Sequence, residues 1–270
     1  MNRNKVIVTG ASGYIGNNFK DYVRLHVSSE IAENFKFLSR SELDITDIHA
    51  VECLVEEGDL IVHLACLDNK RSAEGVKDSF FVNSFGTEVI ARVARNKSAL
   101  LLMVSTSEVL SIENQNEDIT SDRYNYARHK IYSENIVSTL CLPGAYKILR
   151  LFSVYGGLNS KSVVDIFRRN AVAGKQVTID NPSATRDFVS INDVCRMILA
   201  LSRDWDYLNE SITNFGSGIH TRLDEITRVL SAKYEYDLQI NLNYKPLEIN
   251  LAAEINHIEH LENLEDYLNQ

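Results

Sequence analysis

The sequence predicts a doubly wound α/β fold, with a parallel sheet covered by helices on both faces and a small C-terminal α/β lobe. Three observations favour this fold class. Short apolar runs that suit buried strands alternate with longer runs of helical spacing over residues 1–157. A glycine-rich turn joins the first strand to the first helix at residues 9–16. The alternation loosens toward the C-terminus, so we assign residues 158–270 to a lobe interleaved with returning elements of the first domain.

The glycine-rich turn is Thr9-Gly10-Ala11-Ser12-Gly13-Tyr14-Ile15-Gly16, and it follows the apolar strand 6–8. Gly10 allows a tight turn, Gly13 lets the backbone approach a pyrophosphate, and Gly16 lets the helix pack closely on the sheet. The N–H groups and the dipole of the first helical turn then attract phosphates. The turn therefore favours a dinucleotide site over a glycine turn without a ligand. The buried face of the helix is expected at Phe19, Tyr22, Val23 and Leu25.

Composition narrows the classes of function. With 270 residues, 44% of them hydrophobic, the chain can bury the core of one large α/β unit or of a nucleotide domain with an appended lobe. A formal charge of −9 argues against nonspecific binding to nucleic acid or anionic lipid. We expect a cytoplasmic protein, because the N-terminus enters a strand directly and no apolar run reaches the ~20 residues of a membrane span. The cysteines are too scattered for a metal motif and are interpreted as buried reduced thiols: Cys53, Cys66, Cys141 and Cys195.

The end of the second predicted strand, residues 35–39, indicates which cofactor binds. In dinucleotide-binding folds the adenosine ribose lies there. Ser39 and Arg40 occupy this position, and a hydroxyl with a guanidinium suits the 2′-phosphate of NADP, although Arg40 could also be a solvated surface residue. Asp44 could accept a hydrogen bond from an adenine amino group, or could cap a helix as Asp47 could.

A third apolar run, residues 59–65, ends in small residues over which a cofactor could pass. His63 lies inside this run and is interpreted as a hydrogen-bonded core histidine rather than a catalyst. A helix is expected over residues 78–97, with Asn83 near its start. Its apolar face is predicted at Val82, Phe85, Val89 and Val93.

The candidate chemistry follows the strand 100–104, which runs into Ser105-Thr106-Ser107-Glu108-Val109. Carboxyl ends of parallel strands are where doubly wound folds bind ligands. The next helix carries Tyr126 and Lys130 at i and i+4, on one face, although this spacing also occurs by chance. The ammonium and an oxidised nicotinamide would lower the tyrosine pKa from ~10. Tyr126 could then exchange a proton with a substrate oxygen that Thr106 also binds, while the nicotinamide carries the hydride.

The rest of the chain is expected to complete the sheet and the lobe. Residues 185–194 are expected to enter a helix through an Asn/Asp cap. Further strands are expected at 146–152 and 177–179, and further helices at 162–174, 223–232 and beyond 254.

Together these motifs resemble the extended short-chain dehydrogenase/reductases, in the group of nucleotide-sugar epimerases, dehydratases and reductases. The resemblance spans nearly the whole chain and implies a Rossmann domain that binds NAD(P), followed by a substrate-binding lobe. The matching segments are TGASGYIG (9–16), LDITD (43–47), DLIVHLA (59–65), Asn83 with Gly86-Thr87, STSEV (105–109), YNYARHK (124–130), LRLFSVYG (149–156), TRDFVSINDV (185–194) and NFGSG (214–218).

The resemblance implies a catalytic role for four residues. Thr106, Tyr126 and Lys130 match the Ser/Thr, Tyr and Lys of the family. Glu108 matches a glutamate that serves as an acid/base in some dehydratases and decarboxylases. The expected cofactor-binding residues are Gly10, Ser12, Gly13, Tyr14, Ile15, Gly16, Ser39, Arg40, Asp44, Ile45, Leu64, Ala65, Asn83, Tyr126, Lys130, Phe152 and Val154.

Substrate contacts are expected from Ser107, Ser153 and Arg186, the last of which matches an arginine that meets a sugar nucleotide's pyrophosphate. The chain departs from the family pattern at several positions. Arg40 replaces the acid usual in NAD-retaining epimerases and dehydratases, and Ser153 replaces an Asn that contacts substrate in many members. Gly157 stands in place of a common Pro, and Leu110-Ser111 in place of Tyr-Gly.

The sequence thus favours an NADP(H)-dependent reductase that acts on a keto group of a nucleotide-linked deoxysugar. An NAD-retaining nucleotide-sugar epimerase or 4,6-dehydratase is the alternative, favoured by Glu108 and the segment 185–188. A non-catalytic NAD(P)-sensing or scaffold protein ranks below both, because such proteins often lose the Tyr or the Lys. The helices at 78–97 and 125–141 resemble the pair through which the family commonly forms homodimers.

Overall fold

The computed structural model describes residues 5–67, 76–113, 122–175, 179, 184–234 and 261–269 of the chain. These residues fall into two compact units, and each is described by itself. Unit 1 comprises residues 1–150 and 195–213, and unit 2 comprises residues 151–194 and 214–270. Each unit is therefore assembled from two separate stretches of sequence.

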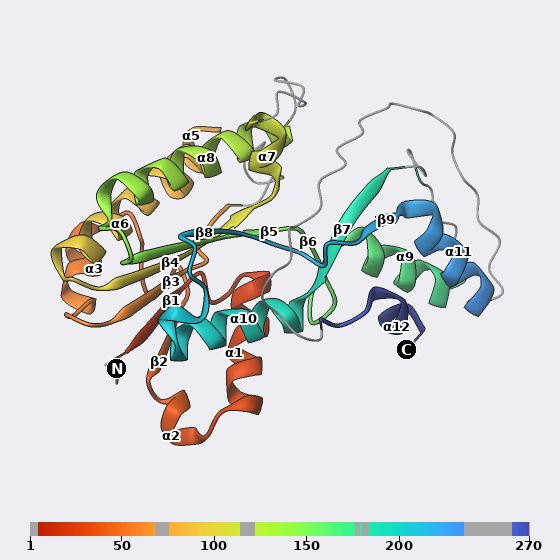
Figure 1. The fold of residues 1–270 in the computed structure, drawn as a ribbon, viewed down its shortest axis with the longest axis horizontal. Coiled ribbons are helices and arrows are strands. Elements are labelled where there is room, and N and C mark those ends of the chain that lie inside the picture. Colours follow the sequence, from red (N-terminus) through yellow and green to blue (C-terminus); the bar gives the residue numbers. More distant parts are fainter. Residues whose placement is uncertain are drawn as a thin grey trace. The chain divides into compact units, whose positions relative to one another are not determined.

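Unit 1 is built on a six-stranded parallel sheet (Figure 1). β1 pairs in parallel with β2 and with β3, and β3 pairs in parallel with β4. Every residue of β1 and β3 is buried, as expected of parallel strands that helices cover on both faces. The strands, in spatial order, are β2 (Phe35–Leu38), β1 (Val6–Thr9), β3 (Leu60–His63), β4 (Leu100–Thr106), β5 (Tyr146–Leu151) and β8 (Ile212–Phe215).

The strand order creates a topological switch point between β1 and β3. The chain moves from β1 to β2 on one side and then returns to β3 on the other side of β1. The connections after β1 and β3 therefore leave in opposite directions, and doubly wound folds bind their ligands between such connections. The glycine-rich turn follows β1 directly, so the fold places it at this point.

Helices cover both faces of the sheet (Figure 1). On one face Phe19 of α1 contacts the rings of Phe35 and Phe37 on β2, edge to face. On the other face α3, α6 and α8 pack on the strands. The helical elements of this unit are α1 (Tyr14–His26), α2 (Ser29–Ala32), α3 (Ile48–Leu54), α5 (Val76–Phe80), η1 (Phe81–Phe85), α6 (Gly86–Asn96), α7 (Glu108–Glu113), α8 (Asp122–Leu140), α10 (Ile191–Arg203) and η2 (Trp205–Tyr207).

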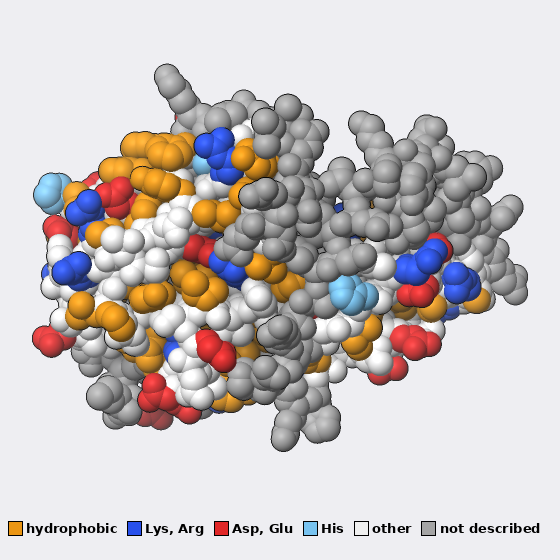
Figure 2. Space-filling view, turned by 45° about the horizontal axis from the view of Figure 1, so that its top comes forward, with side chains coloured by type: hydrophobic (Ala, Val, Ile, Leu, Met, Phe, Trp, Pro, Cys, Tyr) orange, Lys and Arg blue, Asp and Glu red, His pale blue; other side chains and the backbone are white. Residues whose placement is uncertain are grey.

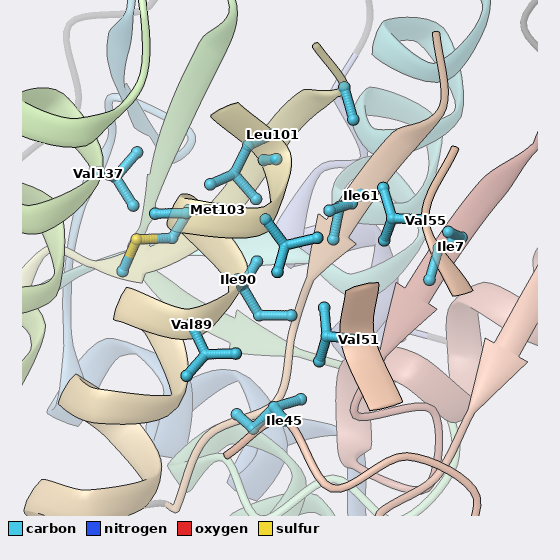
Figure 3. Close-up of a cluster of buried hydrophobic side chains, with 14 of the residues drawn as sticks. Ile7, Ile45, Val51, Val55, Ile61, Val89, Ile90, Leu101, Met103 and Val137 are labelled. Carbon is cyan, nitrogen blue, oxygen red and sulfur yellow. The ribbon is translucent and has the colours of Figure 1, made fainter. Parts of the chain in front are cut away.

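An apolar contribution to this packing is a cluster of buried side chains between the sheet and α3, α6 and α8 (Figure 3). Branched side chains on the strands meet branched side chains on the helices, so the cluster fixes where each helix lies over the sheet. Its labelled members are Ile7, Ile45, Val51, Val55, Ile61, Val89, Ile90, Leu101, Met103 and Val137.

The helix expected over residues 78–97 has a π-helical turn, η1, between α5 and α6. Val89 and Val93 are buried as predicted, but the prediction that Phe85 shares their face is wrong, since its side chain is 37% exposed. A π turn contains one more residue than an α turn would, which rotates the preceding side chains around the axis. On α1 the prediction for Leu25 is also wrong, because its side chain is 76% exposed.

Unit 2 contains a small mixed sheet in which β7 (Thr185–Ser190) lies between β6 (Ser153–Tyr155) and β9 (His220–Arg222). β6 and β7 are parallel, and β7 and β9 are antiparallel. Ser162 caps α9, as its hydroxyl accepts from the backbone N–H of Asp165. The helices of this unit are α9 (Val163–Val172), α11 (Leu223–Tyr234) and α12 (Leu264–Asn269).

The last helix of the chain, α12, is bound to the core of unit 2. Leu268 is buried in the apolar cluster that also holds Tyr155 and Phe167. The Tyr267 hydroxyl donates to Oδ1 of Asp165 at 2.6 Å, while Oδ2 of Asp165 accepts from the backbone N–H of Gly156 at 2.9 Å. Further hydroxyl donors from Ser160 and Ser162 reach Oδ2, and these hydrogen bonds outweigh burial and hold the pKa of Asp165 below its usual value.

Two expected elements fall on residues that the structure describes only in part. Of the strand expected at 177–179 only residue 179 is described, and of the helix expected beyond 254 only residues 261–269. Within the described ranges, none of the helices combines the length and the apolar composition that crossing a bilayer would require.

Candidate functional site

The glycine-rich turn has the geometry that its glycines predict. Gly10 has a φ of +71°, and a Cβ built there would lie 2.6 Å from the backbone nitrogen of Ala65, in the loop after β3. A Cβ on Gly16 would collide with the carbonyl of Gly10 and with Ala11. These two glycines therefore let three backbone segments, the turn, the start of α1 and the loop after β3, approach one another closely.

The N-terminus of α1 suits an anion. Gly13 precedes the helix, and among the described residues no side chain caps this end with a hydrogen bond. The first turn also lacks an acidic residue. Ser12 and Gly13 are exposed, and Tyr14 and Ile15 are half-buried. Amide groups and the helix dipole are thus presented with no competing carboxylate, as a pyrophosphate requires.

A buried chain of hydrogen bonds connects this turn to the helices above the sheet. The Ala65 N–H donates to Oγ1 of Thr9 at 3.3 Å, and the Thr9 hydroxyl lies 2.9 Å from Nδ1 of His63. Nε2 of His63 lies 3.0 Å from Oγ1 of Thr87, whose proton goes to the carbonyl of Asn83 at 2.6 Å. Thr87 must therefore accept from His63, so the imidazole carries its proton on Nε2 and accepts on Nδ1.

His63 is neutral in this chain. Burial, with a smaller contribution from the Lys130 charge, lowers its pKa to about 3. The interpretation of His63 as a hydrogen-bonded core histidine is therefore confirmed: it is 2% exposed, with a partner on each ring nitrogen.

Asn83 lies in the π turn and holds the loop after β3 by its backbone. Its Oδ1 accepts from the N–H of Leu67 at 2.7 Å, and its Nδ2 donates to the Leu67 carbonyl at 3.0 Å. The side chain is 2% exposed, so the amide faces this loop rather than solvent. The Asn83 carbonyl accepts from Thr87 and from Ser133 of α8, at 2.6 and 2.7 Å. An irregular turn at a functional site is a common use of π geometry.

The loop after β2 contains a carboxylate that the sequence interpretation missed. Glu42 Oε2 accepts from the backbone N–H of Ser39 at 2.8 Å and from its hydroxyl at 2.6 Å. These two hydrogen bonds lower the pKa of Glu42. The signal was present in the sequence, because Ser39 and Glu42 have the S-x-x-E spacing of a capping box. Arg40 is exposed in the same loop.

Asp44 holds a local turn: its Oδ1 accepts from the N–H and the hydroxyl of Thr46, at 3.0 and 2.7 Å, and these contacts lower its pKa. Asp47, rather than Asp44, caps α3. Ile45 is buried, and a Cβ on Gly86 would lie 2.6 Å from its Cδ1, so the glycine lets the start of α6 pack on this residue. The loop therefore presents Arg40, Ser39 and Glu42 on a rigid base.

Helix α8 brings the expected catalytic residues to the ends of β3 and β4. Tyr126 is half-buried, and its hydroxyl lies 3.9 Å from Sγ of Cys66, in the loop after β3. Lys130 is 5% exposed, and its ammonium donates to the carbonyl of Val104 at 2.6 Å. Thr106 ends the same strand two residues later and is half-buried. The tyrosine thus contacts the loop after β3, and the lysine contacts β4 near its carboxyl end.

Glu108 begins α7, with one residue between it and the end of β4. Its backbone N–H donates to Oγ1 of Thr106 at 3.2 Å, which leaves the threonine hydroxyl proton for another acceptor. Ser107 and Glu108 are both half-buried. Four residues with hydroxyl or carboxylate groups therefore lie at or just after the end of β4, as the sequence pattern predicts: Ser105, Thr106, Ser107 and Glu108.

Leu64 is half-buried directly after β3, and the remaining predicted residues belong to unit 2. Phe152 is 6% exposed, and its N–H donates to the Phe215 carbonyl at 3.1 Å. Ser153 and Val154 are half-buried on β6, and Arg186 is half-buried on β7.

Beside Arg186, Asp187 is a buried acid that the sequence interpretation did not single out. Its Oδ1 accepts from the N–H and the hydroxyl of Ser217, at 2.6 and 2.7 Å, and its Oδ2 accepts from the Gly218 N–H at 2.9 Å. A Cβ on Gly216 would lie 2.5 Å from Oδ2, so this loop closes on the carboxylate only with glycine. Asp187 therefore ties the loop 216–218 to the strand that carries Arg186.

Two of the four cysteines differ from the expectation of buried thiols. Cys53 is exposed and Cys66 is half-buried, whereas Cys141 and Cys195 are buried. Burial raises the pKa of Cys141 to about 11 and that of Cys195 to about 12, so both are unreactive thiols at neutral pH. In the part of the chain that the structure describes, no group of His, Cys, Asp and Glu side chains could hold a metal ion.

The sequence and the fold of this chain are similar to those of known proteins. A model described as the NAD dependent epimerase/dehydratase family matches residues 6–215. The chain is 29% identical over 250 residues to GDP-6-deoxy-D-talose 4-dehydrogenase of Aggregatibacter actinomycetemcomitans, a match that covers 88% of this chain and 83% of that protein. It is 27% identical over 213 residues to dTDP-4-dehydrorhamnose reductase of Mycobacterium tuberculosis, covering 73% of this chain and 66% of that protein.

Among solved structures, the fold is similar to that of dTDP-4-dehydrorhamnose reductase from Bacillus anthracis in complex with NADP. The TM-score is 0.76, and the match covers 99% of this chain and 98% of that chain. The sequence identity is 18%, so this likeness shows the fold alone.

Proposed function

The chain belongs to the NAD dependent epimerase/dehydratase family, and from that premise we propose that it is an NADP(H)-dependent reductase of a keto group on a nucleotide-linked deoxysugar. Its relatives include a 4-dehydrogenase and a reductase that are named for nucleotide-linked 6-deoxysugars. The observation that carries the proposal is the position of α8, which holds Tyr126 at the end of β3 and Lys130 at the end of β4. The end of β3 lies beside the glycine-rich turn, because Ala65 in the loop after β3 closely approaches Gly10.

The residues of unit 1 fit the cofactor. The uncapped start of α1 would bind the pyrophosphate, and the small residues Ala65 and Gly10 leave room for a nucleotide to pass over the strand ends. The loop after β2 would hold the adenosine ribose, with Arg40 toward a 2′-phosphate. When bound, the nicotinamide supplies the hydride.

The chain's own side chains would handle the proton. In the proposed reduction the Tyr126 hydroxyl donates its proton to the keto oxygen as that oxygen gains charge. The Thr106 hydroxyl hydrogen-bonds the same oxygen and orients the substrate. The Lys130 ammonium, one helical turn away, stabilises the phenolate that remains on Tyr126. Arg186 is proposed to bind the pyrophosphate of the sugar nucleotide through its guanidinium.

A screen of 4-keto nucleotide sugars tests the proposal. Each compound is incubated with NADPH or NADH, oxidation of the cofactor is followed by absorbance, and the product is identified by nuclear magnetic resonance. We expect consumption of reduced cofactor in proportion to a new carbinol. Product formation without net cofactor oxidation would contradict the reductase proposal.

An NAD-retaining epimerase or 4,6-dehydratase is the second candidate, and two observations favour it. Glu42 places a carboxylate in the ribose loop, where it would repel a 2′-phosphate, and Glu108 lies beside Thr106 as an additional acid/base. Such an enzyme keeps its cofactor through the cycle. Cofactor that survives purification, detected by absorbance after denaturation, would favour this candidate, whereas the reductase is expected to exchange its cofactor and to purify without it.

We also propose that the chain forms a homodimer through α5, η1, α6 and α8. Aromatic side chains on these elements are exposed, with Phe80 at 46%, Phe81 at 51% and Tyr132 at 47% exposure. The Phe80 ring contacts the Tyr132 ring at a tilt, and the Phe81 ring stacks on that of Phe85. Hydrophobic side chains gather at the upper left of Figure 2, over this part of the molecule. Exposed apolar side chains that gather in one patch are a common feature of protein interfaces.

A further inference from the structure

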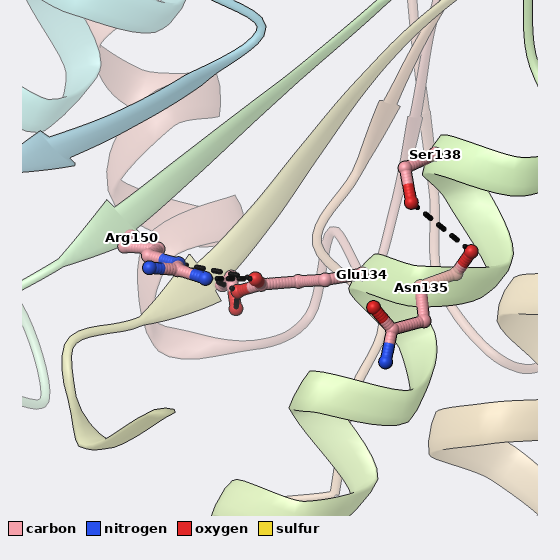
Figure 4. A network of polar contacts seen from close by, with 5 residues as sticks. Glu134, Asn135, Ser138 and Arg150 are labelled. Carbon is pink, nitrogen blue, oxygen red and sulfur yellow. Dashed lines mark hydrogen bonds and ion pairs between the residues drawn. The ribbon is translucent and has the colours of Figure 1, made fainter. Parts of the chain in front are cut away.

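A buried acid lies on α8, one helical turn beyond Lys130. Glu134 is 4% exposed, and its carboxylate accepts from Arg150 on β5 through two guanidinium nitrogens (Figure 4). Nε of Arg150 lies 3.0 Å and Nη2 lies 2.7 Å from Oε2 of Glu134. The other oxygen, Oε1, accepts from the hydroxyl of Ser105 on β4. The helix is thus joined to two neighbouring strands by one carboxylate.

The partners of Lys130 and Glu134 are consecutive residues of one strand. Lys130 donates to the carbonyl of Val104, and Glu134 accepts from Ser105. Thr106 is the next residue of that strand, and Tyr126 is one turn before Lys130 on the helix. Residues four apart on a helix share a face, so Tyr126, Lys130 and Glu134 form one stripe along α8. A shift of this stripe along the strand would change the distance between the two reacting hydroxyls.

A buried ion pair is a costly way to obtain stability alone. Removing two charges from water costs free energy that their attraction only partly returns, and apolar side chains of similar size often stabilise a protein as well or better. What an ion pair provides is geometry, because a bidentate carboxylate and guanidinium accept only one arrangement. Both groups are nearly buried here, with side-chain exposures of 12% for Arg150 and 5% for Glu134.

We propose that Glu134, held by Arg150, is a positioning residue that fixes the register of α8 on β4 and thereby the placement of Tyr126 and Lys130 against Thr106. Glu134 acts through the helix and touches neither substrate nor cofactor. The inference rests on the proposed function, in which Tyr126 and Thr106 bind the same substrate oxygen. If the pair served only stability, its removal would lower the melting temperature and leave the kcat of the folded enzyme unchanged.

Three variants separate these roles. Ser105→Ala removes the bond to β4 and keeps the charge pair. Glu134→Gln keeps the shape and an acceptor but removes the charge. Glu88→Gln is the matched control, because Glu88 also pairs with an arginine, Arg92, at 2.6 Å, on the surface of α6. For each protein, kcat, KM, the dissociation constant of NADPH and the melting temperature are measured at a temperature where all variants are folded.

For folded Ser105→Ala and Glu134→Gln we expect kcat to fall by about a hundredfold, as a misplacement of roughly 1 Å would cause, with the NADPH dissociation constant unchanged. Glu88→Gln is expected to keep the wild-type kcat. A wild-type kcat in both folded variants would overturn the proposal, and so would a loss confined to KM or to the melting temperature.

A second readout does not depend on finding the substrate. The ultraviolet difference spectrum between a protein and its Tyr126→Phe counterpart isolates the Tyr126 phenolate, and its pH midpoint reports how near Lys130 is held. Ser105→Ala changes no charge, so it is expected to move this midpoint upward, while an unmoved midpoint would overturn the positioning role. If wild-type protein reduces none of the tested sugars, the proposed function fails, and the midpoint alone decides this inference.

Discussion

Tyr126 and Lys130 lie one helical turn apart, but one contacts a loop and the other a strand. The tyrosine hydroxyl meets Cys66 after β3, whereas the lysine ammonium donates to Val104 on β4. The hydroxyl and the ammonium therefore have different partners, although both side chains lie on the same face of α8. Single substitutions at this scale can test chemistry without dismantling the site.

Tyr126→Phe is expected to lose turnover by roughly 10²–10⁴-fold, the usual contribution of a positioned general acid, with NADPH affinity retained. Steady-state kinetics and fluorescence titration of NADPH measure the two quantities. Tyr207→Phe is the control, since Tyr207 is an exposed tyrosine on η2. Undiminished turnover in Tyr126→Phe would remove the tyrosine from the mechanism.

The ribose loop leads to a prediction about the cofactor. Arg40 attracts a 2′-phosphate, and a charge-assisted contact of about 1.5–3 kcal/mol would favour NADPH by roughly tenfold or more, less where solvent screens it. The Glu42 carboxylate, which accepts a hydrogen bond from Ser39, opposes this preference because it would repel a 2′-phosphate. We therefore expect Arg40→Ala to weaken NADPH binding and Glu42→Gln to strengthen it, with NADH affected little.

Titration of both reduced cofactors into the three proteins measures these effects. Equal or tighter binding of NADH by wild type would remove the main support for the reductase and favour the NAD-retaining alternative.

At the scale of elements, the glycine turn and the loop after β3 approach each other more closely than side chains would allow. Gly10→Ala is expected to destabilise the fold for two reasons, a positive φ and a collision with Ala65. Gly144→Ala isolates the first reason, because Gly144 has a φ of +81° and a Cβ there meets no described atom within 4 Å. Urea unfolding should show a loss of roughly 1–2 kcal/mol for Gly144→Ala and a larger loss for Gly10→Ala. Equal losses would mean that the close approach contributes nothing.

The hydrogen-bond chain through His63 joins β1, β3 and α6, and it makes stability depend on pH. The folded-state pKa is about 3, whereas the ordinary value is 6.5, so between these values the unfolded chain binds the additional proton. The contribution of His63 is therefore complete above pH 6.5 and is lost at about 1.4 kcal/mol per pH unit as the pH falls toward 3.

Chemical unfolding between pH 7 and pH 5 measures this slope, and subtraction of variants isolates it from the titration of the acids. His63→Gln is expected to show a shallower decline than wild type. His49→Gln should keep the wild-type slope, since the His49 side chain is 89% exposed. A wild-type slope in His63→Gln would show that another group causes the pH dependence.

At the scale of the whole molecule, the aromatic surface over α5, η1 and α8 leads to a prediction of self-association. Wild-type chain is expected to be a dimer by light scattering at micromolar concentration, and replacement of Phe80 and Phe81 by Ser is expected to give a monomer. Leu25→Ser, at another exposed apolar position, should leave the dimer intact. A wild-type monomer would contradict the proposed dimer.

The sequence predicted most of the sheet, because parallel strands are buried on both faces and appear as apolar runs. It also predicted the glycine turn, because the spacing of the glycines reflects local backbone geometry. What it could not predict depends on contacts distant in sequence. The partners of His63 lie 54 and 24 residues away, and Glu134 meets Arg150 and Ser105 through the fold. The π turn, with its single additional residue, could not be predicted from the spacing of the apolar residues.

The C-terminal helix has a consequence for the order of synthesis. Tyr267 completes the hydrogen bonds of Asp165, and Leu268 fills the core of unit 2, so that unit lacks part of its interior until the last residues exist. Unit 1 in turn waits for residues 195–213, which supply part of α10 and of the edge strand β8. A ribosome must therefore translate residue 213 before the first unit can close and residue 268 before the second can, although β1, β2, β3 and β4 can already pair with one another once residue 106 has been made.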